Sequence, residues 1–204
     1  MKNNFFNYFK PSILITVIGA LVISLYLAKN HWELSIAISG TVSMLLVLIS
    51  KYLWKIKPFK WLFWVDDFSG RYEGILRFQY INEQGKSQYG ERKHVKVISQ
   101  NGSRISIASF TFCEDGTKSS PSYNKGLFVE PTEDGHHFQL SYSYLNEGNA
   151  QIGFHSHFGT DVLKFIRKGN SKELSGYYYT NRNPQTRGDY QKLTWVSNDL
   201  NHEF

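Results

Sequence analysis

The chain has 204 residues, and its 23 Lys and Arg exceed its 17 Asp and Glu, which gives a formal charge of +6 at pH 7. This excess lies in residues 1–60, which hold seven lysines and a single acid, Glu33. Residues 61–204 are neutral overall, which argues against a long nucleic acid as partner but does not exclude a small ligand with one or two phosphates. The only cysteine, Cys113, excludes an intrachain disulfide and agrees with a reducing compartment.

Two uncharged apolar stretches predict a transmembrane helical hairpin over residues 12–54, preceded by a short N-terminus over residues 1–11. The first stretch is Ser12–Ala28, and the second is Leu34–Ser50, which can extend to Trp54 at the membrane interface. A helix of 17 residues spans roughly 25 Å, near the lower limit for the hydrocarbon core. The short link between the two stretches allows only an antiparallel arrangement.

A cleaved signal peptide is the alternative for the first stretch, but cleavage after Ala28 would place Tyr26 at the −3 position, where a small residue is required. Lysines then predict the orientation. The link holds one lysine, which Glu33 offsets, whereas six lysines flank the outer ends of the hairpin: Lys2, Lys10, Lys51, Lys55, Lys57 and Lys60. By the positive-inside rule both termini are cytoplasmic, and the helices contact lipid.

Small residues recur every four positions on both helices and predict close helix packing, because they let backbones approach in lipid. Two interpretations remain open: the stripes pack the hairpin against itself, or they also join hairpins of different protomers. The stripe positions are Thr16, Ala20 and Ser24 on the first helix and Ser35, Ser39 and Ser43 on the second.

Residues 55–65 form a basic and aromatic connector, in which Pro58 ends the helix. Its aromatic side chains suit two environments equally. As belt residues, Trp61, Phe63 and Trp64 would lie at the level of the lipid headgroups. As core residues, they would close one end of the domain that follows.

Residues 66–204 alternate apolar and polar positions between turn signals, which predicts an all-β domain. Asn101-Gly102 is a strong hairpin signal. About eight antiparallel strands of this length close most economically as a small up-and-down barrel, with a β-sandwich as the alternative. Gly70 and Gly176 begin two strands and suit the sharp coiling of a small barrel. The pattern also predicts three local features: a loop over 114–122, a strand over 152–158 and a break at Gly159-Thr160.

The sequence holds no phosphate loop and no nucleophile elbow, so we expect neither an enzyme nor a resident cofactor. His155 and His157 share a strand face, but no Cys or carboxylate stands at matching spacing, so we expect no metal site.

Aromatic and basic residues alternate along the β domain. Tyrosine faces stack on nucleobases and arginine forks hold phosphate, so this alternation suits a nucleotide ligand. The competing interpretation is that inward aromatics only fill a small barrel. On chemistry, the candidate ligand residues are Phe78, Tyr80, Tyr142, Tyr144, Tyr178, Arg77, Arg92, Arg104 and Arg182.

The order of hairpin, basic connector and small β-barrel resembles the membrane-disrupting effectors of CBASS, the cyclic-oligonucleotide-based anti-phage signalling systems of bacteria. The segments Phe68–Phe78 (FSGRYEGILRF) and Leu174–Thr180 (LSGYYYT) carry the resemblance within the barrel. The resemblance implies a multi-pass inner-membrane protein that senses a cyclic dinucleotide made by a partner nucleotidyltransferase. The ligand then drives homo-oligomerisation, membrane disruption and abortive infection by cell death. The alternative function is a membrane-tethered, lipocalin-like barrel that binds an apolar small molecule.

Overall fold

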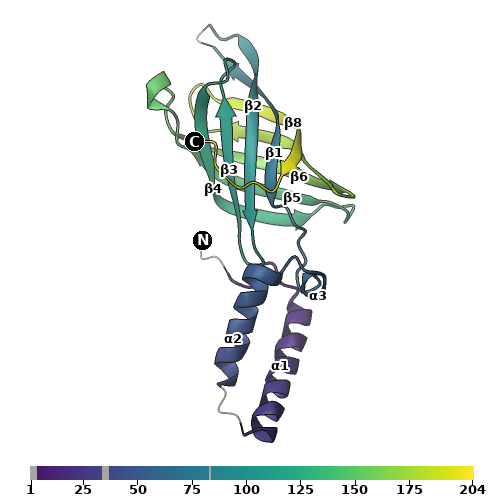
Figure 1. Cartoon of the computed structure of the whole chain (residues 1–204). Coiled ribbons are helices and arrows are strands. Elements are labelled where there is room, and N and C mark those ends of the chain that lie inside the picture. The colour runs from purple at the N-terminus through teal and green to yellow at the C-terminus, as the bar shows by residue number, and fades with distance from the viewer. Residues whose placement is uncertain (1–3, 34–36, 83) are drawn as a thin grey trace. The chain divides into compact units, whose positions relative to one another are not determined.

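A computed structural model describes residues 4–33, 37–82 and 84–204, in two compact units. The helical unit comprises the chain up to residue 67 together with the turn Gln100–Arg104. The barrel unit comprises Phe68–Ser99 and Ile105–Phe204. Figure 1 shows the helices and strands of each unit.

Helix α1 (Pro11–His31) begins with a proline in its first turn, where the missing N–H costs no hydrogen bond. Its length of 21 residues and the apolar stretch within it make it long and apolar enough to cross a membrane. Helix α2 (Ile38–Leu48) continues as the π-helical turn η1 (Ile49–Leu53). This combined apolar helix is shorter than about 20 residues, so its length alone does not establish a second span.

The connector contains a single helical turn, α3 (Lys57–Lys60), and then pairs with the segment before α1. Phe63 forms an antiparallel bridge with Phe9, and their ring centroids lie 4.4 Å apart. Phe63 is therefore buried within the helical unit. Trp61 is exposed, whereas the indole N–H of Trp64 donates to the carbonyl of Asn7. The three connector aromatics thus occupy three different environments.

The small-residue stripes lie on exposed helix surfaces. Thr16, Ala20 and Ser24 on α1 are exposed, as are Ser39 and Ser43 on α2. Ser35 lies outside the described residues. The residues of these helices that are buried are larger and apolar: Leu14, Val42 and Leu46. Within one chain, the five described stripe residues therefore remain available to another surface.

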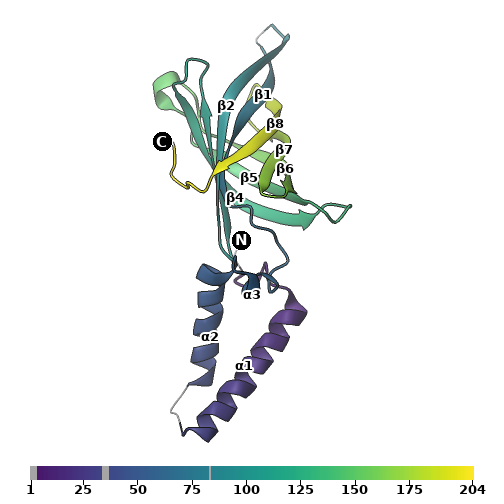
Figure 2. The same cartoon turned by 45° about the vertical axis from the view of Figure 1, so that its right-hand side comes forward.

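Eight antiparallel strands form one closed barrel in chain order, with β8 paired back to β1. Figure 2 shows this junction, where β1 lies between β2 and β8. The predicted up-and-down barrel is confirmed, and the sandwich alternative is wrong. The strands are β1 (Gly70–Ile81), β2 (Ser87–Gln100), β3 (Ile105–Phe112), β4 (Lys118–Pro131), β5 (Phe138–Asn146), β6 (His157–Lys168), β7 (Ser171–Thr180) and β8 (Thr186–Ser197).

Large apolar side chains fill one end of the barrel interior. Phe68 is fully buried, and its ring meets those of Phe138 and Phe165 at 5.4 and 4.8 Å. The hydroxyl of Tyr72 donates to the Phe68 carbonyl at 2.7 Å. This apolar half leaves the other end of the interior to polar residues.

Two glycines allow the coiling that the sequence suggested. Gly70 has a φ of 131°, and a Cβ there would lie 2.2 Å from the indole nitrogen of Trp195. Gly176 has a φ of 155° beside a register shift between β7 and β8, and its Cβ would meet the Val162 carbonyl. Both positions therefore require glycine for conformation and for space.

Three local predictions were wrong. The loop expected over 114–122 ends earlier, because β4 already begins at Lys118. The strand expected over 152–158 is mostly a loop with the short 3₁₀ turn η2 (Ala150–Ile152), and β6 begins at His157. Gly159 lies inside β6 opposite Tyr144, where a Cβ would stand 2.3 Å from the tyrosine ring. This glycine makes room for a ring rather than breaking the strand.

Candidate ligand-binding cavity

A cavity of about 240 Å³ opens at the end of the barrel where β1 ends and β2 begins. Side chains from all eight strands and from the loops after β5 and β7 contribute to its wall. One part of the wall carries hydroxyl and amide groups, from Ser109, Thr111, Ser119, Ser120, Ser122 and Asn146. Another part is aromatic, from Phe78, Tyr144, Phe154, Tyr178 and Tyr190.

The polar wall follows from strand alternation. In β4, Ser120 and Ser122 point inward, and both hydroxyls accept hydrogen bonds from the amide of Asn146, at 2.9 and 3.0 Å. These serines belong to residues 114–122, a polar stretch for which the sequence predicted a loop. Their inward direction shows that the polarity serves the cavity instead.

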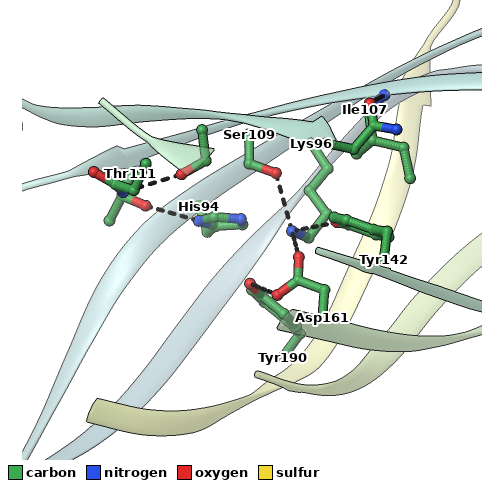
Figure 3. Close-up of polar contacts among 11 residues, drawn as sticks. His94, Lys96, Ile107, Ser109, Thr111, Tyr142, Asp161 and Tyr190 are labelled. Carbon is green, nitrogen blue, oxygen red and sulfur yellow. Dashed lines mark hydrogen bonds and ion pairs between the residues drawn. The ribbon is translucent and has the colours of Figure 1, made fainter. Parts of the chain in front are cut away.

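The ion pair of Lys96 and Asp161, drawn in Figure 3, forms the cavity floor. The ammonium of Lys96 on β2 lies 2.7 Å from Asp161 on β6, and both side chains are essentially inaccessible. Lys96 also donates to Ser109 and Tyr142, at 3.0 and 3.1 Å, and Tyr190 donates to the second Asp161 oxygen at 2.9 Å. All three ammonium protons therefore have acceptors, which offsets the cost of burying the charge.

Burial governs the ionisation of this floor. Desolvation lowers the pKa of Lys96, and Asp161 opposes that change. Burial also raises the pKa values of Tyr142 and Tyr190 well above 10, so both phenols stay protonated: Tyr190 donates to Asp161, and Tyr142 accepts from Lys96. The floor thus presents a fixed set of hydrogen bonds at neutral pH.

His94 lies beside this network and is neutral. Its Nδ1 is 3.0 Å from the Thr111 hydroxyl, while its buried Nε2 has no partner. Burial and the charge of Lys96 hold the pKa of His94 well below its usual 6.5. The imidazole therefore offers the cavity one unused hydrogen-bonding atom.

Two arginines face the cavity with unused donors. Arg92 on β2 lies over the Phe78 ring at 5.6 Å, and Arg182 after β7 lies over the Phe154 ring at 5.0 Å. Nη1 of Arg92 and Nε of Arg182 are buried without a hydrogen-bond partner. Burial lowers the pKa of Arg182. Unpaired buried guanidinium nitrogens are costly, so their position indicates an anionic ligand.

The charge of the wall supports the same conclusion. Three cationic side chains, Arg92, Lys96 and Arg182, face one carboxylate, Asp161, which gives a formal charge of +2. Asp161 already bonds to Lys96 and Tyr190, so it does not neutralise the arginines. The cavity combines this positive charge with aromatic faces and hydroxyl groups. That combination suits a phosphorylated ligand with stacking rings.

A family model for the Cap15 cyclic dinucleotide receptor domain matches residues 63–194. The chain belongs to this family. Every residue of the cavity wall lies inside the matched region, whereas α1, α2 and the residues after 194 lie outside it. No curated protein and no solved structure matches the chain. The Cap15 domain is a receptor for cyclic dinucleotides and supports the resemblance to CBASS effectors.

Five of the nine predicted ligand residues line the cavity of this Cap15 domain: Phe78, Tyr144, Tyr178, Arg92 and Arg182. Tyr80 does not line it, but its ring stacks on Phe78 at 6.2 Å. Tyr142 lies under the floor, bonded to Lys96.

The two remaining arginines lie elsewhere. Arg77 points outward, because alternation along β1 turns Leu76 and Phe78 inward, and it pairs with Glu91 at 2.7 Å. Arg104 lies in the turn between β2 and β3, which belongs to the helical unit. There the N–H of Gly102 donates to the Ser50 carbonyl at 2.8 Å.

The prediction missed the floor of the cavity. Lys96 stands between Val95 and Val97 in an apolar run, and such a lysine was the one available signal of a buried charge. Asp161 and Tyr190 become visible only through the barrel register. Among the residues that the structure describes, no group of three metal-ligand side chains comes together.

Proposed function

We propose that this chain is a cyclic-dinucleotide-activated membrane effector of bacterial anti-phage defence. Ligand binding in the barrel promotes oligomerisation, and the assembled helices disrupt the inner membrane and kill the infected cell. The observation that carries this proposal is the pair of buried guanidinium nitrogens, on Arg92 and Arg182, without partners in an aromatic cavity. A cyclic dinucleotide carries two phosphodiesters, so its charge complements the +2 of the wall.

In the proposed complex, Arg92 and Arg182 hold phosphate and one base stacks on Tyr144 or Tyr178. The serine and asparagine wall then meets the polar edges of that base. The volume of about 240 Å³ lies just below the usual range of roughly 300–1,000 Å³ for ligand sites. We therefore expect part of the ligand to remain at the open mouth.

An apolar ligand, as in lipocalin-like barrels, is less favoured. Such a ligand would leave the unpaired nitrogens of Arg92, His94 and Arg182 buried without partners. It would also desolvate the serine wall with no hydrogen bonds in return.

The membrane step requires two spans and a multi-pass inner-membrane protein with both termini in the cytoplasm. The length and apolarity of α1 support one span, and α2 with η1 would supply the second. The ligand, made by a partner nucleotidyltransferase, must bind the assembled state more tightly than the resting state, because otherwise it shifts no equilibrium. Exposed small residues on both helices suit close packing between protomers in lipid.

The proposal is tested by dye entry into cells that express the full chain with a cyclic dinucleotide synthase. We expect dye entry only with the synthase. Changing both Ser39→Leu and Ser43→Leu should preserve insertion and ligand binding but abolish dye entry, because close helix packing is lost. The control changes Met44→Leu, which is exposed on α2 but lies off the line of Ser39 and Ser43, and should keep dye entry. Equal membrane abundance must be verified for each variant. Dye entry without the synthase would contradict gating.

A further inference from the structure

The outer surface of the barrel carries an apolar strip across β2 and β3. Alternation places His94 and Lys96 inside, so Val95 and Val97 point outward. On β3, Ser109 bonds to Lys96 inside, so Ala108 and Phe110 also point outward. We call the set Val95, Val97, Ala108 and Phe110, with Phe112 and Tyr123 at its border, the outer strip.

The outer strip is covered by the C-terminal segment, residues 198–204, whose yellow trace crosses β2 and β3 in Figure 1. Phe110 is completely buried although it points away from the barrel interior. The His202 and Phe204 rings lie 5.2 and 5.3 Å from the Phe110 ring. Phe204 also meets Phe112 edge-on at 5.8 Å.

Charged contacts fix the position of this segment on the strip. Glu203 forms an ion pair with Arg71 on β1, and the ammonium of Lys118 lies 5.3 Å from the centre of the Phe204 ring. These contacts combine an apolar anchor with one ion pair and one cation–π contact. The strip is therefore shaped for the sequence His202-Glu203-Phe204.

The link between β8 and this anchor is exposed and uses local hydrogen bonds. The N–H of Asp199 donates to Ser197, and the N–H of Asn201 donates to Asp199. Residues 198–201 are exposed, and four extended residues reach about 14 Å. Such a link permits the anchor to leave its own strip while the barrel stays intact.

We propose that the outer strip is a contact surface between protomers, occupied by the C-terminal segment of a second copy in the assembled effector. In the resting chain the segment covers its own strip. On assembly, neighbouring protomers exchange segments and restore the same contacts in trans, which makes the exchange inexpensive. This inference rests on the proposed ligand-driven assembly, and the segment that it concerns, residues 198–204, lies outside the matched Cap15 region.

Photo-crosslinking of the full chain in detergent tests the exchange. One protein carries Phe204→benzoylphenylalanine, and it is mixed equally with isotope-labelled protein of the original sequence. The probes are cyclic di-AMP, cyclic di-GMP, cyclic GMP–AMP and cyclic di-UMP. Without ligand, crosslinks should reach only the unlabelled β3 peptide. With a binding ligand, about half of the crosslinked β3 peptides should be labelled, because exchange partners are drawn at random.

A matched control places the photoreactive residue at Tyr89, which is exposed on β2 outside the strip, and should yield no labelled β3 peptide. Ligand binding and light scattering are measured on the same samples. Assembly with crosslinks only to the unlabelled strip would overturn segment exchange and leave the proposed function intact. Absence of binding by every probe would overturn the proposed function and, with it, ligand-driven exchange.

Discussion

The two cavity arginines allow a quantitative test of the ligand site. We expect Arg92→Gln and Arg182→Gln each to weaken cyclic dinucleotide binding, because each removes a charged donor to phosphate. Hydrogen bonds to charged groups contribute about 1.5–3 kcal/mol, which corresponds to a loss of about 10- to 150-fold in affinity. Isothermal titration calorimetry on the full chain in detergent measures this change.

The same two substitutions should not reduce stability. Nη1 of Arg92 and Nε of Arg182 are buried without partners in the ligand-free protein. Removing an unsatisfied buried donor relieves a desolvation cost of about 1–3 kcal/mol, so the Tm should stay constant or rise. Weaker binding together with unchanged or higher stability would distinguish a ligand-holding role from a structural one.

The control for this experiment is Arg77→Gln. Arg77 is exposed and pairs with Glu91 on the outer surface, where an ion pair contributes about 0–1 kcal/mol. We expect the affinity of the Arg77→Gln variant for the cyclic dinucleotide to match that of the unchanged protein. Unchanged affinity in both Arg92→Gln and Arg182→Gln, or an equal loss in Arg77→Gln, would refute the assignment of phosphate to this cavity.

Three further predictions concern the wall and floor. Tyr144→Leu should cost about 1–3 kcal/mol of binding free energy, measured by calorimetry, because a stacking partner is lost. Tyr89→Leu on the outer surface should leave the binding free energy unchanged, and equal affinities of the two variants would argue against stacking at Tyr144. Asp161→Asn should reduce the free energy of unfolding by about 3–5 kcal/mol in denaturant titrations, because it leaves the charge of Lys96 buried without a carboxylate. A loss below about 1 kcal/mol would contradict the role of Asp161 as the counter-charge of Lys96. His94 has a lowered pKa when folded, so the unfolded chain binds more protons as the pH falls through about 6.5, and stability should decline there. His94→Asn should lessen that decline in unfolding measured from pH 8 to pH 5, and an identical pH profile would disprove the contribution of His94.

Strand alternation explains why much of the barrel could be predicted. Leu140, Tyr142 and Tyr144 share the inner face of β5, as their spacing of two indicates. The glycines at 70 and 176 likewise have the unusual backbone angles that their place in the pattern suggested. These features depend on neighbours along the chain, which the sequence contains directly.

The rest of the site depends on contacts between distant strands. Lys96 and Asp161 are 65 positions apart, and only the barrel closure brings β2 opposite β6 across the interior. Polar residues usually indicate exposure, so Ser120 and Ser122 resembled a loop although they face the cavity. Arg77 and Arg104 had suitable chemistry, but strand alternation and the β2–β3 turn direct them elsewhere.

Above all, we propose that the barrel cavity binds a cyclic dinucleotide. Calorimetric titration of the full chain with cyclic dinucleotides, and with a fatty acid as the apolar comparison, tests it most directly. We predict saturable binding of at least one cyclic dinucleotide at one site per barrel, weakened by added salt because phosphate charge is recognised. Binding of the fatty acid alone, or binding of no cyclic dinucleotide by the folded protein, would contradict the account.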